Sequence, residues 1–363
     1  MTANPIRVGL IGVHPEKGWA TTAHIPALRQ LPEYRIQAIS HNREDVARSA
    51  AEQFGIATYY DSSQDLVTDP DVDLVVVTVK VPHHRQLILQ AIEAGKSVFS
   101  EWPLGVDLAE ANLLCDSAKE AEVRTAIGLQ TRAAPAFSYG RSLVKDGYVG
   151  RVLSATMIGS GIIWGDSMSD GFEYTLDPSN GASMLHVPFA HSIDGLLHLL
   201  DERVSTVSAV LSNSRDSVRL LESGNVVPMS VPDQVQLSST LHSGAALTVH
   251  FRGGMSRGTN FHVEINGTDG DLILTSPVGY VGIGGTTLMG ARHEETLHQL
   301  EVPAEYDQYA EVGMPAQSLA IQYARLASDL VHGTTLAPDF DDAIGLHRLI
   351  KVIEQSGGAS RHP

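Results

Sequence analysis

This sequence of 363 residues has little cysteine and a shortage of positive charge. Its single cysteine, Cys115, excludes an internal disulfide and any metal site built on several thiolates, and it is compatible with a reducing cytoplasm. The chain carries 25 Lys+Arg against 42 Asp+Glu, a formal net charge of −17, and it contains no run of basic residues. We therefore expect no nucleic-acid partner, because binding a phosphate backbone needs clustered positive charge.

Long apolar segments are scarce as well. The longest strongly apolar run, Leu74–Val79, has the length of a strand and falls far below the roughly 20 residues that a membrane-crossing helix needs. The first residues show no charged leader followed by an apolar stretch, so no targeting signal is expected. These features predict a soluble cytoplasmic protein that does not bind membranes.

Strand and helix signals alternate over the first third of the chain, which is the pattern of a parallel sheet covered on both faces. The run Leu74–Val79 is rich in branched residues, as expected for a strand buried on both sides. The other expected strands are Ile6–Ile11, Tyr34–Ser40, Ser97–Ser100 and Val123–Gly128. The expected helices are one that ends near Leu31, followed by Glu44–Phe54, His84–Ala94 and Leu108–Glu122.

The sequence pattern changes after Arg132. Longer segments of alternating apolar and polar residues, separated by Gly, Ser and Asn, predict an open, mostly antiparallel sheet. The expected strands are Leu153–Ile158, Val204–Leu211, Gln234–Leu241, Ala245–Phe251, His262–Ile265 and Leu272–Leu274, with helices at Pro135–Lys145 and Met184–Leu200. We therefore predict two domains, 1–128 and 129–363. A last helix at about 340–355 is expected to pack back on the first domain.

The loop after the first strand, GLIGVHPEKGWATTAHIPAL, suggests a dinucleotide site. Its glycines are Gly9, Gly12 and Gly18, so a strict G-x-G-x-x-G is absent and the loop is longer than that fingerprint allows. The context supports the assignment, since the loop follows a buried strand and opens a helix whose amides can face an anion. Gly12 permits close backbone approach, and Gly18 and Ala20 keep the start of the helix slim.

The end of the second strand bears on the choice of cofactor. NAD-binding proteins usually place an acid there for the ribose hydroxyls, but the sequence reads Ser40-His41-Asn42-Arg43. A hydroxyl and a guanidinium suit a 2′-phosphate, because arginine can bind it with two hydrogen bonds. NADP is therefore favoured over NAD, although Arg43 can equally be a solvated residue at the start of a helix.

Several motifs together resemble the Gfo/Idh/MocA oxidoreductases, and the likeness covers nearly the whole chain. It rests on AHIPAL, DVDLVVVTV, HHRQLILQAIEAGKSVFSEWPL, GLQTRAAPA, KDGYVGRV, NGASMLHVPFAHSID, INGTDGDLIL and DFDDAIGLHRLI. KGWA, VKVP, SEWPL and PFAHSID are more similar to one branch, the galactose-regulon regulators. The resemblance implies an α/β fold with an N-terminal Rossmann domain and a C-terminal α+β domain, whose open, mostly antiparallel sheet forms a homodimer or homotetramer.

The resemblance also implies that Glu101, Trp102 and Pro103 lie beside the nicotinamide. The typical enzyme has Glu-Lys-Pro there, with the lysine assisting proton movement, whereas this chain has Trp102. An indole donates one hydrogen bond and does not exchange a proton at neutral pH. Trp102 can instead stack on the nicotinamide or on a sugar ring, or fill a domain interface.

Proton transfer then needs another group with a pKa near the working pH, and histidine is the natural candidate. His191 and Asp194 match the family's H-x-x-D, whose histidine faces substrate; the family's aspartate four residues earlier is Val187 here. His186 lies before Pro188 in the sequence, and His191 and Asp194 lie after it. Lys80, in the loop after the central strand, is a second candidate proton carrier, or it pairs with a phosphate or an acid. No metal site is expected.

The complete set of expected cofactor contacts is Gly12, Gly18, Trp19, Ala20, Ser40, Asn42, Arg43, Val79, Lys80, His84, Glu101, Trp102, Pro103 and Gln130. The expected substrate contacts are Trp102, Arg132, Trp164, Tyr174, His186, His191 and Asp194. These residues predict an NADP- or NAD-dependent oxidoreductase acting on a sugar, a cyclitol or a similar cyclic alcohol or ketone. The alternative is a dinucleotide-binding regulator without catalysis that grips a protein partner. A third possibility is elimination or hydrolysis with a retained cofactor.

Overall fold

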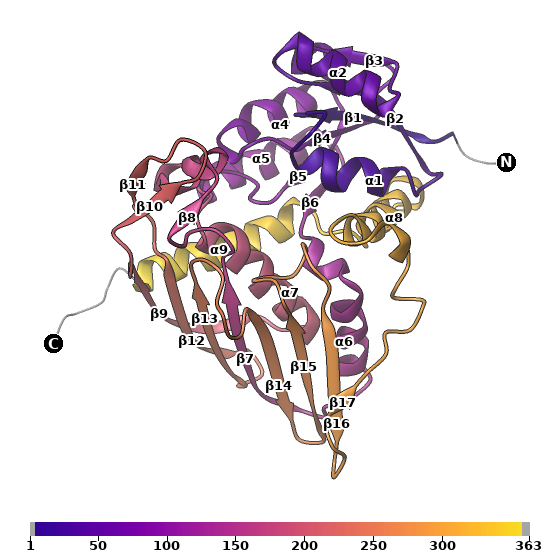
Figure 1. Ribbon diagram of the computed structural model, residues 1–363. Helices are drawn as coiled ribbons and strands as arrows, with labels where there is room; N and C mark the ends of the chain where they lie inside the picture. The colour runs from indigo at the N-terminus through magenta and orange to yellow at the C-terminus, as the bar shows by residue number, and fades with distance from the viewer. Residues whose placement is uncertain (1–3, 358–363) are drawn as a thin grey trace. The chain divides into compact units, whose positions relative to one another are not determined.

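The structure, a computed structural model, describes residues 4–357. Contacts within the chain divide it into two units. Unit 1 comprises the chain up to Leu129 together with Tyr309–Gly345, and unit 2 comprises Gln130–Gln308 and the chain from Leu346 onward. Each unit is described by itself (Figure 1).

Unit 1 contains a fully parallel sheet of six strands in the order β3-β2-β1-β4-β5-β6. This order reverses between β1 and β4, which is the arrangement of a dinucleotide-binding Rossmann sheet and confirms the expected fold class. The strands are β1 Ile6–Ile11, β2 Tyr34–Ser40, β3 Thr58–Tyr60, β4 Leu74–Val77, β5 Ser97–Glu101 and β6 Thr125–Gly128.

Burial on both faces explains the apolar runs of this sheet. Every residue of β4 is at most 1% exposed, as its branched residues predicted. The helices of unit 1 are α1 Ile25–Leu28, α2 Glu44–Phe54, α3 Ser63–Thr68, α4 His84–Glu93, α5 Leu108–Glu120 and α8 Ala316–His332, with short turns at Ala20–His24, Val81–His83 and Ala310–Val312. The first expected helix therefore consists of a π-helical turn followed by α1.

The helix α8 was not anticipated, and it moves a late segment of the chain into unit 1. Figure 1 shows α8 beside α1, although about 290 residues separate them in the sequence. Leu319, Tyr323 and Leu326 of α8 are buried in the same core cluster as Val8 and Leu10 of β1. Residues 309–345 thus group with the first unit, whereas the sequence analysis assigned all residues after 128 to the second.

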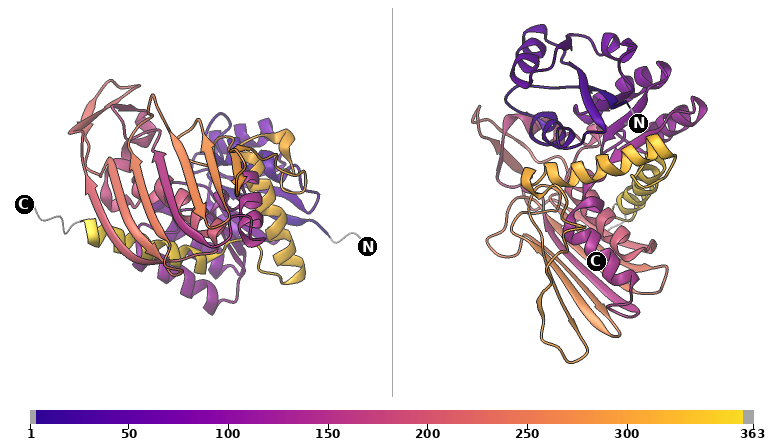
Figure 2. Two further views of the ribbon diagram at one scale, coloured as in Figure 1. Left: turned by 90° about the horizontal axis from the view of Figure 1, so that it is seen from below. Right: turned by 90° about the vertical axis from the view of Figure 1, so that its right-hand side faces the viewer.

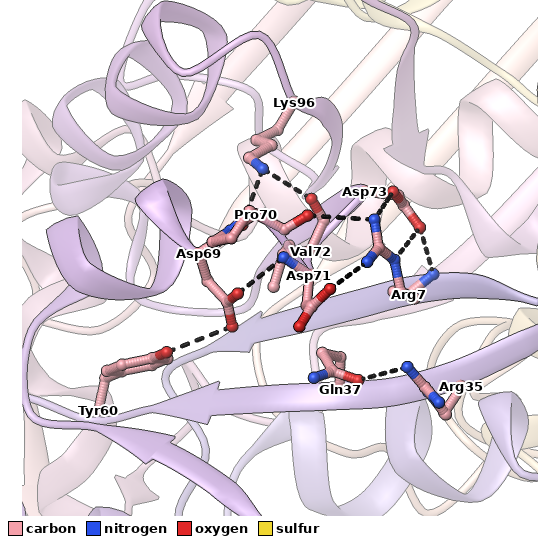
Figure 3. Close-up of polar contacts among 10 residues, drawn as sticks. All are labelled: Arg7, Arg35, Gln37, Tyr60, Asp69, Pro70, Asp71, Val72, Asp73 and Lys96. Atoms are coloured by element: carbon pink, nitrogen blue, oxygen red, sulfur yellow. Dashed lines mark hydrogen bonds and ion pairs between the residues drawn. The ribbon is translucent and has the colours of Figure 1, made fainter.

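The amino ends of β1 and β4 are held by a polar cluster (Figure 3). The guanidinium of Arg7 donates to both carboxylate oxygens of Asp73, at 2.9 and 2.8 Å, and its Nη1 lies 2.5 Å from Asp71. Lys96 donates to the backbone carbonyls of Asp69 and Val72, at 2.9 and 2.8 Å. These charges are used to close loops at the amino edge, so the opposite, carboxyl edge is where ligand chemistry is expected.

Unit 2 is built on a mixed, mostly antiparallel sheet of eight strands in the order β17-β16-β15-β14-β7-β13-β12-β9. Only the β7–β13 pair of this sheet is parallel, which confirms the expected class. The strands are β7 Val152–Ser160, β9 Val204–Ser212, β12 Gln234–Leu241, β13 Ala246–Arg252, β14 Phe261–Gly267, β15 Gly270–Ser276, β16 Thr287–Arg292 and β17 His298–Gln299.

Helices cover one face of this sheet, where α6 Pro135–Lys145 and α7 Ala190–Leu200 lie side by side (Figures 1 and 2). Phe137 of α6 packs on Phe261 of β14, at 6.3 Å between ring centroids. Along β12 every second residue is buried and the residues between them are largely exposed, which is the alternation of a sheet covered on one face.

A smaller three-stranded sheet was not anticipated: β8 Ser167–Met168, β10 Ser217–Leu220 and β11 Val226–Pro228. Short helical turns lie at Gln130–Ala133, Asp170–Leu176, Pro178–Asn180 and Leu185–Phe189. The last helix, α9, spans Phe340–Gly357; its residues through Gly345 group with unit 1 and the rest with unit 2. None of the helices that the structure describes combines the length and the apolar character needed to cross a membrane.

Candidate functional site

The carboxyl edge of the unit 1 sheet brings the glycine loop against the end of β4. Gly12 has φ +95°, and a Cβ at this position would lie 2.6 Å from Cγ1 of Val79. The amides of Gly12 and Val13 donate to the carbonyl of Ser40, at 2.9 and 3.2 Å. The backbone is therefore held open by a glycine at the switch point of the sheet, where a dinucleotide is bound in folds of this type.

The long insertion in this loop is ordered by side chains that bond its carbonyls. Gln53 of α2 donates to the carbonyl of Pro15 at 2.8 Å, and Thr22 donates to the carbonyl of Gly18 at 3.1 Å. Ala20, almost fully buried, opens the helical turn. The indole Nε1 of Trp19 is buried with no hydrogen-bond partner among residues 4–357. An unmatched donor beside a glycine cradle fits a ligand that carries acceptor oxygens.

At the end of β2, Ser40 was expected to offer its hydroxyl to a phosphate. The residue is 2% exposed, because β2 lies between β1 and β3 and its carbonyl is covered by the loop. Asn42 and Arg43 are exposed. The guanidinium of Arg43 is paired with both carboxylate oxygens of Asp45, with Nε 3.1 Å from Oδ1.

Two histidines lie next to each other at this corner. The rings of His14 and His41 meet edge to face with centroids 6.1 Å apart. Burial lowers the pKa of His41, and the neighbouring His14 and Arg43 lower it further, because each disfavours a second positive charge. Neither histidine was selected from the sequence as a site residue. Their position next to the glycine loop and the second strand is the signal that could have found them.

Glu101, the last residue of β5, is held from beneath. Its Oε1 lies 3.0 Å from Nε2 of His24, and Nδ1 of His24 lies 2.7 Å from the hydroxyl of Tyr323. Both His24 and Tyr323 are fully buried. Gly128, at the end of β6, leaves room for the carboxylate, since a Cβ there would come within 2.5 Å of Oε1. These three supporting residues were missed in the sequence, although His24 lies within the AHIPAL motif.

The segment after Glu101 is also fixed in place. His84 is 1% exposed, its Nδ1 lies 2.9 Å from the carbonyl of Pro103, and its Nε2 lies 2.9 Å from the carbonyl of Val79. Burial lowers the pKa of His84, which favours the neutral ring. His84 was expected to line the cofactor groove; its enclosed ring links the backbone after β4 to the backbone after β5. Trp102 is 4% exposed, and Lys80 is exposed.

In unit 2, the expected pair His191 and Asp194 lies on α7. The ring of His191 stacks on Tyr280, with centroids 6.4 Å apart and an interplanar angle of 17°. The carboxylate of Asp194 accepts two hydrogen bonds from Arg132, at 2.8 and 2.6 Å. Arg132 therefore forms a bidentate, largely buried pair that ties the Gln130–Ala133 turn to α7.

The remaining expected substrate residues have mixed surroundings. His186 lies between Ser183, 2.8 Å from its Nδ1, and Glu354, 3.3 Å from its Nε2. Trp164 is 3% exposed, and its indole Nε1 is buried without a hydrogen-bond partner in the described part of the chain. Burial raises the pKa of Tyr174. Gln130 is 3% exposed at the first position of unit 2.

Residues 4–357 contain no group of three or more His, Cys, Asp or Glu side chains placed to hold a metal ion. The donors at the carboxyl edge of unit 1 are backbone amides, an indole and a carboxylate. This combination suits an organic ligand with phosphates and hydroxyls.

Comparisons with known proteins agree with this division into a nucleotide-binding unit and a second unit. Residues 6–129 match the model of an oxidoreductase family with an NAD-binding Rossmann fold, and residues 135–276 match the model of the Gal80p C-terminal domain.

Two relatives and one solved structure illustrate the similarity. The galactose/lactose metabolism regulatory protein GAL80 of Saccharomyces cerevisiae is 28% identical over 305 residues, covering 79% of this chain and 70% of the relative. The dehydrogenase aclE of Aspergillus oryzae is 34% identical over 203 residues, covering 54% of this chain and 55% of the relative. The crystal structure of a super-repressor mutant of Gal80p from Saccharomyces cerevisiae superposes with a TM-score of 0.87 at 25% identity, covering 98% of this chain and 97% of that one.

Proposed function

We propose, on the premise that residues 6–129 belong to the Gfo/Idh/MocA oxidoreductases and residues 135–276 to the Gal80p C-terminal domain type, that the chain is an NAD(P)-dependent oxidoreductase. Its reaction would transfer a hydride between the nicotinamide and a sugar, a cyclitol or a similar cyclic alcohol or ketone. The observation that carries this proposal is the carboxyl edge of the unit 1 sheet, where Gly12 lies against Val79 and Glu101 is held by His24.

The cofactor would be held by the glycine loop, whose lack of a Cβ at Gly12 lets the backbone approach a pyrophosphate. Glu101 would accept hydrogen bonds from the nicotinamide half. Arg43 at the end of β2 supports a preference for NADP, because a guanidinium can bind a 2′-phosphate with two hydrogen bonds. Asp45 opposes this preference by engaging Arg43, and rotation of that exposed pair would be needed to bind the phosphate.

When bound, the nicotinamide supplies the acceptor or donor for the hydride. This chain's residues must then move the proton of the substrate hydroxyl and orient its ring. His191 is the proposed proton carrier, since Trp102 replaces the family lysine and an indole has no proton to exchange at neutral pH. Stacking on Tyr280 fixes the plane of the His191 ring, and Lys80 is the second candidate. Trp102, Trp164 and Tyr174 are the proposed aromatic contacts of a cyclic substrate, and Trp102 and Trp164 would need to become accessible, since they are 4% and 3% exposed.

A spectrophotometric screen tests this proposal. Purified protein would be mixed with NADP or NAD and a panel of polyols, aldoses and cyclitols at pH 6 to 9, and with the reduced cofactors and ketones in the reverse direction. We expect the absorbance at 340 nm to rise as the cofactor is reduced by at least one substrate. For His191→Ala we expect kcat to fall at least 100-fold, the usual scale for general acid–base groups. Binding of cofactor without turnover of any compound would contradict the proposal.

The second candidate function is a dinucleotide-binding regulator without catalysis. It is supported by Trp102 in place of the family lysine and by the Gal80p-type match of residues 135–276. The variant Trp102→Lys separates the two candidates. A gain of dehydrogenase activity in a silent parent would indicate a chain that has lost catalysis, whereas an active parent impaired by the substitution would indicate that the indole serves the reaction. Tight cofactor binding with no protein partner would count against the regulator.

An oligomeric state and a cellular location are part of the same proposal. The open face of the unit 2 sheet, with exposed residues alternating along β12, supports association into a homodimer or homotetramer. Size-exclusion chromatography with light scattering measures this directly. A cytoplasmic location is proposed from the single cysteine, Cys115, which is buried and unpaired.

A further inference from the structure

Three side chains from distant parts of unit 1 form one buried chain of polar contacts. Tyr323 of α8 lies 2.7 Å from Nδ1 of His24, and Nε2 of His24 lies 3.0 Å from Oε1 of Glu101. His24 and Tyr323 are fully buried, whereas the side chain of Glu101 is 12% exposed at the carboxyl end of β5. A buried polar chain that ends at the ligand edge of the sheet is costly to retain without a role, because each member must stay satisfied.

Nε2 of His24 faces the carboxylate of Glu101 at 3.0 Å, and a nitrogen in that position must carry a proton, since its lone pair would otherwise repel the oxygen. On the other side of the ring, the hydroxyl of Tyr323 lies 2.7 Å from Nδ1. Burial raises the pKa of Tyr323 well above its ordinary value, and the charge of Glu101 acts in the same direction, so this hydroxyl keeps its proton.

Aromatic packing holds the side chains of His24 and Tyr323 in place. The ring of His24 meets Phe99 edge on at 5.5 Å, and Phe99 stacks on Tyr323 at 5.0 Å. Gly128 admits the carboxylate from the other side, because any Cβ there would overlap Glu101. Glu101 is thus confined before a ligand arrives, and a confined acceptor loses less conformational entropy on binding than a mobile one.

We infer that His24 and Tyr323 are positioning residues for the nicotinamide half of the cofactor: Tyr323 orients the ring of His24, and His24 orients the carboxylate of Glu101. The inference rests on the proposed dinucleotide site, but it does not depend on turnover or on the identity of the substrate.

Other titratable groups face this chain. The rings of Tyr34 and Tyr323 pack with centroids 5.4 Å apart. The negative charge of Glu101 acts on His84, and the charges of Glu33 and Asp329 act on Tyr34. None of them contributes a hydrogen bond to His24 in the described structure. Dinucleotide binding should therefore change when the Tyr323 hydroxyl is removed and should stay the same when the Tyr34 hydroxyl is removed.

The test compares two matched variants, Tyr323→Phe and Tyr34→Phe. Each loses one buried hydroxyl and one hydrogen bond, because Tyr34 donates to the backbone carbonyl of Tyr323 at 2.8 Å. Kd for NADPH and for NADH would be measured by fluorescence between pH 5.5 and 9, together with Tm. For Tyr323→Phe we expect Kd to rise about fivefold to tenfold at neutral pH, the scale of one lost hydrogen bond. The dependence of Kd on pH should also differ from that of the parent, because the hydroxyl of Tyr323 no longer contacts His24.

Tyr34→Phe should lower Tm by a similar amount and leave Kd within about twofold of the parent. Equal Kd values and equal pH profiles for the two variants would overturn the inference while leaving the proposed function intact. A parent that binds neither dinucleotide would instead refute the proposed function, and the inference with it. If Tyr323→Phe does not fold, nitrogen NMR of the parent decides: a proton on Nε2 of His24 supports the inference, and a neutral ring with its proton on Nδ1 overturns it.

Discussion

Glu101 occupies the space that a side chain at Gly128 would need. A Cβ on residue 128 would lie 2.5 Å from Oε1 and 2.8 Å from Cδ of Glu101. The two residues end neighbouring strands, β5 and β6, and pair directly in the sheet. The absence of a side chain on one strand therefore makes room for the carboxylate on the other.

Gly128→Ala should displace the Glu101 carboxylate and weaken dinucleotide binding by about tenfold or more, on the scale of one charge-assisted hydrogen bond. The loss of thermal stability should be small, because the overlapping atoms are the carboxylate at the end of the Glu101 side chain and not backbone. Titration with NADPH and a thermal melt check the two effects. Gly345→Ala, in α9 where nothing lies within 4 Å of the new methyl, is the control. It should raise stability by about 0.5–1 kcal/mol, as alanine does within a helix, and leave binding alone.

Gly12→Ala and Gly18→Ala separate backbone strain from close approach. Both glycines have φ +95°, so both substitutions cost backbone strain of about 1 kcal/mol or more. Only the new Cβ at position 12 meets a neighbour, Cγ1 of Val79 at 2.6 Å, whereas nothing lies within 4 Å at position 18. Gly12→Ala should therefore show the larger drop in Tm. If the two variants melt together, the loop is not held against Val79 as described.

Asp45 restrains the residue expected to bind a 2′-phosphate. Asp45→Asn should free the guanidinium of Arg43 and lower Kd for NADPH by about threefold to tenfold without changing Kd for NADH, on the scale of one exposed ion pair. Arg43→Ala should raise Kd for NADPH alone. Arg35→Ala, which removes the same charge from β2 where Arg35 donates to Gln37 at 2.8 Å, serves as the control (Figure 3). A 2′-phosphate site would be contradicted if Asp45→Asn and Arg43→Ala each changed Kd for NADPH and Kd for NADH by equal factors.

The Arg7–Asp73 pair should contribute stability that depends on pH. The hydrogen bond from Arg7 holds the pKa of Asp73 below its ordinary value of 3.8, against the raising effect of burial. In the unfolded chain this carboxyl takes up its proton at a higher pH than in the folded chain. The contribution is therefore complete above about pH 5 and is lost as the pH falls through the folded pKa.

Asp73→Asn should accordingly unfold at a lower urea concentration than the parent at pH 7, and the difference should narrow below about pH 4. Asp116→Asn, which removes one charge from an exposed position of α5, is the control. If the difference in unfolding urea concentration between Asp73→Asn and the parent stayed constant from pH 7 to pH 3, the pair would contribute packing and not charge.

Local pattern was enough to predict most of the elements. The limits expected for Ile6–Ile11, Tyr34–Ser40, Glu44–Phe54, Pro135–Lys145 and Gln234–Leu241 coincide with those of the structure. These segments combine a clear period with glycine, proline or polar residues at their ends, so local chemistry alone sets their limits. The helix α8 carried similar signals, with Pro315 before it and Gly333 after it, and it could have been found in the same way.

The candidate site was predictable only in part. Gly12 and Glu101 lie in recognisable motifs next to strands, and the structure places both at the carboxyl edge of the parallel sheet. The deep burial of Ser40 and His84 was not predictable, because exposure depends on what covers a side chain, and the covering residues come from other strands and loops. A motif identifies a position along the chain, but it carries no information on solvent access.

By itself, the sequence determined the order of strands and helices, the glycine loop and the replacement of lysine by Trp102, because these depend on near neighbours. Only the tertiary structure decided that Tyr323 would meet His24, 299 positions earlier in the chain, and that residues 309–345 would complete the first unit. Such contacts arise when apolar faces of distant segments pack together. Which distant faces pair is settled by the shape and volume of the whole core, which no local pattern contains.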